Sequence, residues 1–364
     1  MTDATAAPVA GGRRVVHFRW DLDKTYLRTE FDTLADLVRT FRTPAHAREV
    51  VPGAPALLRE LLGTSQQATA GVDGRLADER RVTFISGSPR QMRKVLTERL
   101  ALDGITPDAF WLKPNLSNLL TLRLGAVRDQ LGYKLDALLH STVDAEEVDE
   151  LLFGDDAEQD ALVYSLYADL VEGRVELPLL EDLLRAGRVH RREADSILRQ
   201  FDQRLRTRTR VRRIFIHLDR RSPVVRFDVF GDRVVPVYNY FQAAVLLFED
   251  RWLDAGALVR VAASMVSMGY SLDRLAGSLQ DLARRGRVAR ETLARVSAEG
   301  AQNGLHRDLA ERWHVALADV MRGVESYRHR ELPAPDPSVY LSLVCERGRY
   351  RRETFADRAM EWLR

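Results

Sequence analysis

The chain is poor in cysteine, since Cys345 is the only one among 364 residues. A single cysteine excludes an intramolecular disulfide and a cysteine-based zinc cluster, and it suits a reducing compartment. No apolar stretch reaches about 18 residues, so we predict no transmembrane segment. Residues 1–12 lack a basic segment before an apolar one, and we expect a disordered tail there, not a signal peptide. These absences predict a protein of the cytoplasm, either free or peripheral to a membrane.

Net charge and lysine are also scarce. The 55 basic side chains nearly balance 53 acidic ones, which makes nucleic acid an unlikely partner. Only four of the basic residues are lysines, namely Lys24, Lys94, Lys113 and Lys134. A GC-rich coding sequence explains the bias toward arginine, but a retained lysine can mark a site that needs a compact ammonium. The 14 arginines within 185–226 favour an ordinary solvated face, with a nucleic-acid or anionic-lipid surface as the alternative.

Apolar runs that alternate with helical patterns predict an α/β fold. We expect strands at 15–20, 82–85, 109–112 and 151–153, and helices at 34–41, 54–62, 89–102 and 119–131. Further apolar runs follow at 214–218 and 234–240, and the pattern then becomes almost entirely helical. The sequence therefore predicts a parallel sheet with helices on both faces in residues 13–240, and a helical C-terminal region in 241–364.

Polar side chains follow these strands, where open α/β sheets place their sites. Asp21 and Asp23 end the first strand, Ser86 ends the second, and a second acidic group follows at 154–160. Ser88, Pro89 and Gln91 have the spacing of a capping box, which predicts a helix N-terminus just beyond Ser86 that favours phosphate.

Two carboxylates in one turn repel each other unless a cation joins them. The oxygen-only character of the group suits Mg²⁺, which prefers carboxylates, waters and substrate phosphate. Lys134 follows the expected helix at 119–131 and can reach the same crevice. A pair of acidic residues, a hydroxyl, a lysine and a second acidic cluster thus occur in this order along successive strand–helix units.

This order resembles the four motifs of haloacid-dehalogenase-type (HAD-like) phosphatases. The residues that carry the resemblance are Asp21-x-Asp23-x-Thr25, Ser86, Lys134 and Gly154-Asp155-Asp156-x-x-x-Asp160. The amino-acid sequences of segments 84–92, 112–115 and 153–160 resemble those of one branch of this superfamily. That branch contains the catalytic domain of the actin-patch-associated phosphatidate phosphatase and is related to lipins. The resemblance covers about residues 13 to 180 and implies a HAD-like sheet with little or no cap.

The resemblance also implies residue roles. Asp21 is expected to attack phosphorus as a nucleophile, and Asp23 to act as general acid and base. Ser86 is expected to bind a phosphoryl oxygen, and Lys134 to neutralise charge. Mg²⁺ is expected on Asp21, the Asp23 carbonyl and Asp155, with Asp156 and Asp160 as direct or water-mediated ligands, although the spacing does not decide between Asp155 and Asp156. The candidate contacts to the substrate phosphate or headgroup are Lys24, Gly87, Arg90 and Lys113.

The sequence thus predicts a Mg²⁺-dependent phosphomonoester hydrolase, with phosphatidate or a similar lipid phosphate as its favoured substrate. A phosphatase for soluble or polynucleotide phosphates is the alternative enzyme. A non-catalytic HAD-like module that binds lipid or protein is the alternative outside catalysis. The sequence carries no signal of oligomeric state.

Overall fold

A computed structural model describes residues 14–29, 43–63, 79–113, 128–143, 145, 147–157, 159–201, 208–302 and 330–346. The expected tail at 1–12, the helix at 34–41 and most of the helix at 119–131 lie outside the described residues. Residues 303–329 and 347–364 of the C-terminal region lie outside them as well.

The predicted α/β fold is confirmed by a six-stranded sheet with the order β3-β2-β1-β4-β5-β6. All neighbouring strands pair in parallel. The four predicted strands are the apolar parts of longer strands, because backbone pairing continues into neighbouring polar residues. The run at 234–240 is instead divided between β6 and α9, Tyr240–Glu249. The strands are β1 Arg14–Asp21, β2 Glu79–Pro89, β3 Ala109–Lys113, β4 Glu147–Asp155, β5 Arg208–His217 and β6 Val234–Val237.

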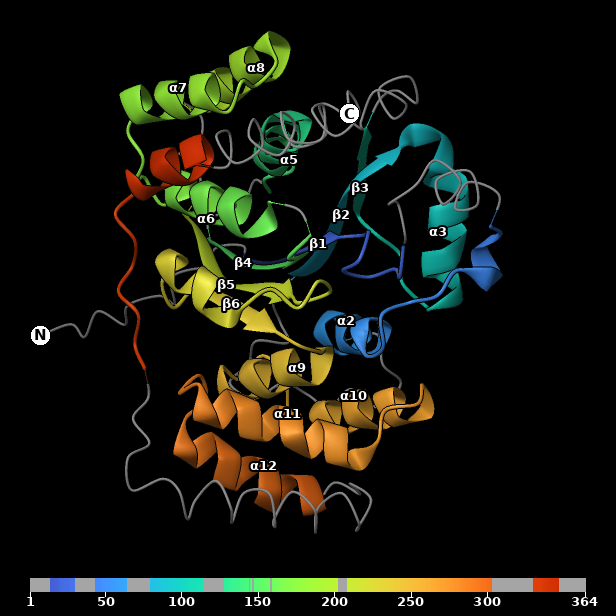
Figure 1. Ribbon diagram of the computed structural model, residues 1–364. Coiled ribbons are helices and arrows are strands. Elements are labelled where there is room, and N and C mark those ends of the chain that lie inside the picture. Colours follow the sequence, from blue (N-terminus) through green and yellow to red (C-terminus); the bar gives the residue numbers. More distant parts are fainter. Residues whose placement is uncertain are drawn as a thin grey trace, which may run out of the picture.

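One face of the sheet is covered by two early helices and the C-terminal helices (Figure 1). Trp20 of β1 lies at the centre of this layer, stacked on Phe153 at 4.1 Å and on Tyr240 at 5.4 Å between ring centroids. The predicted helical nature of the region after residue 240 is therefore confirmed where the structure describes it. The helices of this face are α2 Ala54–Leu62, α3 Arg93–Leu102, α9 Tyr240–Glu249, α10 Ala255–Ser267, α11 Leu272–Arg284 and α12 Arg290–Gln302.

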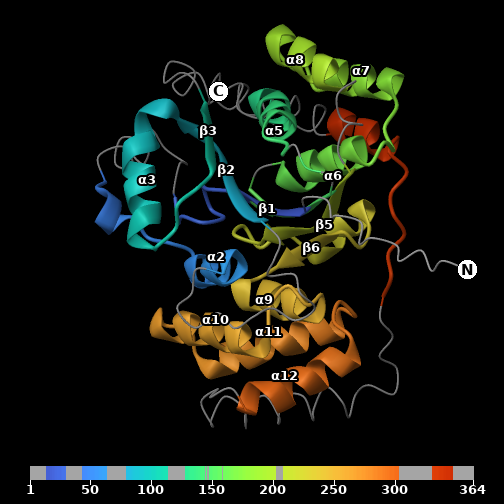
Figure 2. The same ribbon diagram turned by 180° about the vertical axis from the view of Figure 1, so that it is seen from behind.

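The opposite face carries the helices that follow β3 and β4 (Figure 2). They are α5 Arg128–His140, α6 Asp160–Val171, α7 Leu177–Ala186 and α8 Arg191–Phe201, joined by the 3₁₀ helix η5 Val224–Phe230. Right-handed crossovers require this division, since the chain builds outward from β1 to β3 and then returns to place β4 on the other side of β1. The reversal makes β1 and β4 the topological switch point, where such sheets bind ligands.

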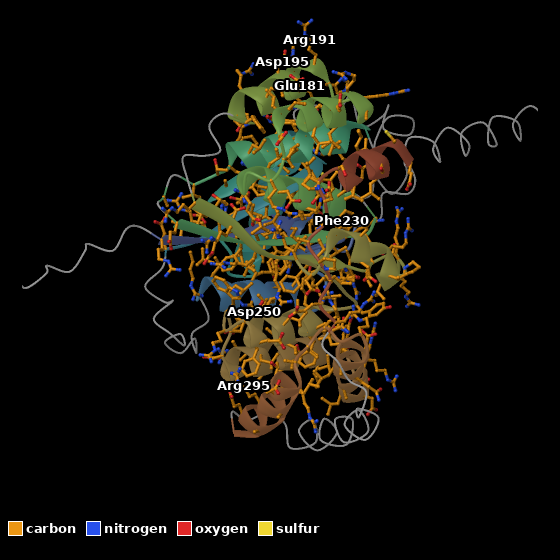
Figure 3. The ribbon with its side chains drawn as sticks, turned by 90° about the vertical axis from the view of Figure 1, so that its left-hand side faces the viewer. Glu181, Arg191, Asp195, Phe230, Asp250 and Arg295 are labelled. Carbon is orange, nitrogen blue, oxygen red and sulfur yellow. The ribbon has the colours of Figure 1, made fainter. Side chains whose placement is uncertain are left out.

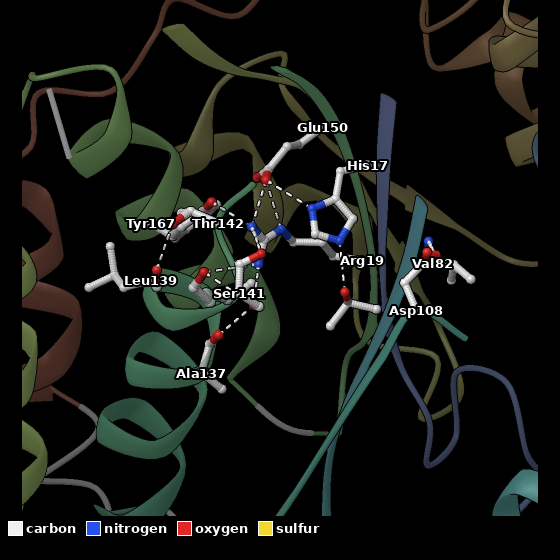
Figure 4. A network of polar contacts seen from close by, with 12 residues as sticks. His17, Arg19, Val82, Asp108, Ala137, Leu139, Ser141, Thr142, Glu150 and Tyr167 are labelled. Carbon is white, nitrogen blue, oxygen red and sulfur yellow. Dashed lines mark hydrogen bonds and ion pairs between the residues drawn. The ribbon is translucent and has the colours of Figure 1, made fainter. Parts of the chain in front are cut away.

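A buried charged network ties β1 to α5 beneath this face (Figure 4). Arg19 is fully buried and donates to Glu150 Oε1 from Nε at 2.8 Å and from Nη2 at 2.6 Å. Its Nη1 also donates to the carbonyl of Leu138 at 2.9 Å, near the end of α5. A buried arginine is tolerated when it is paired in this way, and here it fixes the end of α5 against β1.

His17 extends the network toward β2, with Nε2 2.8 Å from Thr83 Oγ1. Burial, and then the nearby Arg19 charge, lower the pKa of His17, so the unfolded chain binds a proton more readily than the folded one. We therefore expect His17 to contribute stability that is present above about pH 6.5 and is lost as the pH falls toward its lowered pKa. Urea unfolding of wild type and His17→Gln across this range checks it: the wild type should lose more stability on acidification. Equal slopes would contradict the prediction.

The arginine-rich stretch 185–226 falls on α7, α8, β5 and the loop after β5. In the middle of β5, Arg212 Nε lies 2.6 Å from Asp149, and Arg213 Nη2 donates to Asp250 at 2.7 Å. The Arg212 pair is on the solvated face predicted for the stretch, whereas the Arg213 side chain is largely buried. In the described part of the chain, no helix combines the length and apolarity that crossing a membrane requires.

Candidate active site

Three buried carboxylates meet at the carboxyl ends of β1 and β4. Asp21 is the last residue of β1, Asp155 the last of β4, and Asp160 the first of α6. One oxygen from each lies within 4.8 Å of the others. A side chain at Gly154 would collide with Asp160, so glycine lets α6 begin this close to β4.

Lys134 enters the same cluster from α5. Its Nζ donates to Asp21 Oδ1 at 2.8 Å and also pairs with Asp160, whose other oxygen accepts from the Asp155 amide at 3.1 Å. The expectation that Lys134 follows its helix is wrong, because α5 runs on to His140 and Lys134 lies within it. Leu135 and Leu138 bury the next turn against the sheet, so the helix continues past the lysine.

The charge of the cluster favours a cation. Three carboxylates face one described ammonium in a buried site, and the nearly complete burial of all four groups makes an uncompensated charge costly. Oxygen-only donors of this kind suit a hard divalent ion such as Mg²⁺. Asp21, Asp155 and Asp160 therefore fit the metal that the sequence predicts.

Asp23 lies beside the cluster and is held by two hydroxyls. Ser86 Oγ and Ser88 Oγ each donate to Asp23 Oδ2 at 2.9 Å. The predicted capping box is wrong, because β2 continues through Ser88 to Pro89 and α3 begins only at Arg93 after a 3₁₀ turn. Ser88 lies where the register between β2 and β3 shifts, and its hydroxyl donates to Asp23 and not to a helix amide.

Asp156 is not brought into the cluster. Its two oxygens accept from the backbone amides of Arg220 and Ser222, both at 2.8 Å. Its carboxylate thus supports the loop that follows β5, whereas Asp155 faces Asp21. The sequence spacing did not distinguish Asp155 from Asp156. At the end of β4, successive side chains point in opposite directions, and so only Asp155 faces the cluster.

The loop after Asp21 is fixed from β5 and α9. Lys24 has a left-handed φ of +61°, and its carbonyl accepts from His217 Nδ1 at 2.9 Å. Tyr240 Oη donates to the Thr25 carbonyl at 2.7 Å and its ring stacks on His217 at 5.6 Å. No local sequence pattern marks His217 and Tyr240 as the residues that hold this loop.

We expect Tyr240→Phe to lower the free energy of unfolding by about 1 kcal/mol, because it removes one buried hydrogen bond and leaves the ring stacking. Activity should fall by less than about tenfold, since the Thr25 carbonyl keeps its place through neighbouring contacts. Urea unfolding and phosphate release measure the two effects. Unchanged stability would show that the Thr25 contact contributes nothing.

The four candidate substrate contacts lie at or near the carboxyl ends of β1, β2 and β3. Arg90 is exposed, and the space that a side chain at Gly87 would fill is open to at least 4 Å. Lys113 ends β3 with its Nζ 5.6 Å from the centre of the Tyr133 ring. Lys24 Nζ lies 3.9 Å from Asp219. Their roles stay predictions.

Comparison with known proteins bears on the same part of the chain. Residues 20–181 match the family described as phosphatidate phosphatase APP1, catalytic domain. The resemblance predicted from the sequence motifs is thereby confirmed. No curated protein and no solved structure shows a significant match to the chain.

Proposed function

We propose, from the premise that residues 20–181 belong to the catalytic-domain family of phosphatidate phosphatase APP1, that the protein is a HAD-type, Mg²⁺-dependent phosphatase acting on phosphatidate or a similar lipid phosphate. One observation carries the proposal: the buried ion pairs of Lys134 with Asp21 and Asp160, with Asp155 beside them at the ends of adjacent strands.

In the proposed reaction, Asp21 attacks the phosphorus of the bound monoester. A bond forms between its carboxylate oxygen and phosphorus, the bond to the lipid oxygen breaks, and an aspartyl-phosphate results. An attacking carboxylate and a phosphate dianion repel each other in a dry site. Lys134, 2.8 Å from Asp21, offsets that repulsion and fixes the orientation of the carboxylate.

Asp23 is the proposed general acid and base. It gives a proton to the leaving glycerol oxygen and then takes one from the water that hydrolyses the aspartyl-phosphate, which returns Asp21 to its starting form. The hydroxyls of Ser86 and Ser88 hold one oxygen of Asp23, which fixes this carboxylate two residues after Asp21. Ser86 can turn its hydroxyl toward a phosphoryl oxygen once substrate is bound.

Asp21, Asp155 and Asp160 would hold the metal, together with the backbone carbonyl of Asp23. Bound there, Mg²⁺ would neutralise part of the negative charge on the phosphoryl group. Asp156 is not assigned to this set, because both its oxygens already accept from loop amides.

The proposal includes the domain limits and the location of the protein. Residues 13–240 form the phosphatase domain and 241–364 a helical region, and the enzyme works in the cytoplasm at the surface of a membrane. Among the described residues between β1 and β2, only the short helix η1 Ala45–Ala47 and α2 are added. The small or absent cap that the resemblance implies would leave room for a headgroup that stays in a bilayer.

Phosphate release from a panel of phosphatidate vesicles, sugar phosphates, nucleotides and 5′-phosphorylated oligonucleotides tests the proposal. We expect phosphatidate to be turned over with the highest kcat/KM, and only with Mg²⁺ present. Preference for a soluble or polynucleotide phosphate would overturn the lipid assignment. Tight binding to phosphatidate vesicles without turnover of any substrate would instead identify a binding module.

A further inference from the structure

The connection between β5 and η5 leaves the sheet at the same edge as the active site. Leu218 donates its amide to the Val237 carbonyl at 2.9 Å, so the ends of β5 and β6 lie side by side. Asp156 holds the amides of Arg220 and Ser222, and Asp219 lies 3.9 Å from Lys24 of the nucleophile loop. The loop is thus fixed to both motif loops of the proposed active site.

The exposed side chains of this loop, of η5 and of the end of β6 include five that we name the edge patch: Arg221, Pro223, Val225, Arg226 and Tyr238. Val225 is 65% exposed and Tyr238 is 41% exposed, high values for large apolar residues. Arg221 adopts a left-handed φ of +54°, which turns the chain sharply at the point where it faces solvent.

The charge around the edge patch is positive. Of the acidic residues described nearby, Asp156 is taken up by backbone amides, Asp219 pairs with Lys24, and Asp228 pairs with Arg330 at 3.0 Å. Each of these described carboxylates thus has a partner, whereas Arg221 and Arg226 are exposed. Their field attracts anionic groups.

Cations beside an exposed valine and tyrosine match the anionic face of a bilayer. Arginine pairs with lipid phosphates, an aliphatic side chain inserts at the acyl boundary, and tyrosine favours the headgroup level. A nucleic-acid backbone would also attract the arginines, but it offers nothing to Val225. The mixture of the two kinds of side chain therefore favours lipid.

We propose that the edge patch docks on anionic bilayers and holds the active-site edge of the sheet against the lipid headgroups. This inference names the partner surface of the proposed phosphatase and rests on that function for its purpose. Binding itself is independent of turnover, and so it can be measured separately.

The binding test uses full-length protein carrying Asp21→Asn, so that phosphatidate is not consumed. Flotation with vesicles of phosphatidylcholine, alone or mixed with phosphatidate or phosphatidylserine, measures partitioning. We expect Arg221→Glu/Arg226→Glu to weaken partitioning to both anionic mixtures by about tenfold or more, since each cation near such a surface contributes strongly. Val225→Asn should weaken it by several-fold, about the effect of one exposed aliphatic side chain.

Matched controls carry the same changes away from the patch. Arg191 is almost fully exposed on α8, at the far end of the molecule (Figure 3), and Val266 is 36% exposed on α10. Arg191→Glu and Val266→Asn should leave partitioning unchanged. If the patch variants bind anionic vesicles as tightly as their parent, or if the controls lose as much, the proposal is overturned.

Turnover gives the second readout, in protein with Asp21 intact. The patch variants should hydrolyse a soluble aryl phosphate at the wild-type rate and lose turnover of phosphatidate in vesicles in proportion to lost binding. Loss of both activities together would contradict a docking role. If no substrate is turned over at all, the proposed function fails, and the flotation result still decides whether the edge patch binds membranes.

Discussion

Asp21→Asn should reduce phosphate release by at least about a thousandfold, as loss of a nucleophile does in other covalent enzymes. The amide keeps an oxygen that can accept from Lys134, so the variant should fold and bind as wild type does. It loses the negative charge and the nucleophilic oxygen that attack on phosphorus requires. Initial rates with phosphatidate and with a soluble aryl phosphate measure the loss.

Asp156→Asn is the matched control for this change, because it makes the same substitution one residue from Asp155. Asparagine retains one of the two acceptors for the loop amides, so we expect activity within about tenfold of wild type and a small loss of stability. A wild-type rate for Asp21→Asn would refute the proposed nucleophile. If Asp156→Asn abolished activation by Mg²⁺, the metal ligand would have to be reassigned from Asp155 to Asp156.

Lys134→Met should have the second large effect, on both stability and turnover. The substitution removes the ammonium that pairs with the buried Asp21 and Asp160. Breaking a buried ion pair in this way lowers the free energy of unfolding by about 3–5 kcal/mol. Urea unfolding in the presence of a metal chelator measures this loss. Added Mg²⁺ should restore part of it, since a bound cation replaces some of the missing charge.

Lys113→Met serves as the comparison, because Lys113 ends the adjacent strand β3 and its ammonium lies over the Tyr133 ring. A partly exposed contact of this kind is worth about 1 kcal/mol or less, so this variant should stay close to wild type in stability. Equal stabilities of Lys134→Met and wild type without metal would show that the lysine does not balance the carboxylates.

Patterns local in sequence predicted the sheet well, because each buried parallel strand is a short apolar run that ends at polar residues. The same patterns placed Asp21 correctly at the end of β1, but the prediction that Ser86 ends its strand is wrong, because β2 continues to Pro89. They placed Lys134 after a helix that was expected to end at residue 131, whereas α5 continues to His140. Its continuation depends on leucines that pack on a distant face of the sheet.

Contacts between distant segments could not be predicted in the same way. Arg19 occurs in an apolar run, and only the fold brings Glu150 and the end of α5 to it. Ser88 fits a helix cap in sequence, yet its acceptor is Asp23, 65 residues earlier. Such partners are determined by three-dimensional proximity, which a single sequence does not reveal.

The packing of α9 bears on how the protein is made and how it can be divided. β1 is the first described strand to leave the ribosome, but the helix that covers its Trp20 begins at Tyr240, more than 200 residues later. Until that helix arrives, an aromatic surface and the Thr25 carbonyl stay uncovered in the growing chain. A fragment limited to the family match at 20–181 would keep that surface exposed permanently, and we expect it to aggregate where the full chain folds.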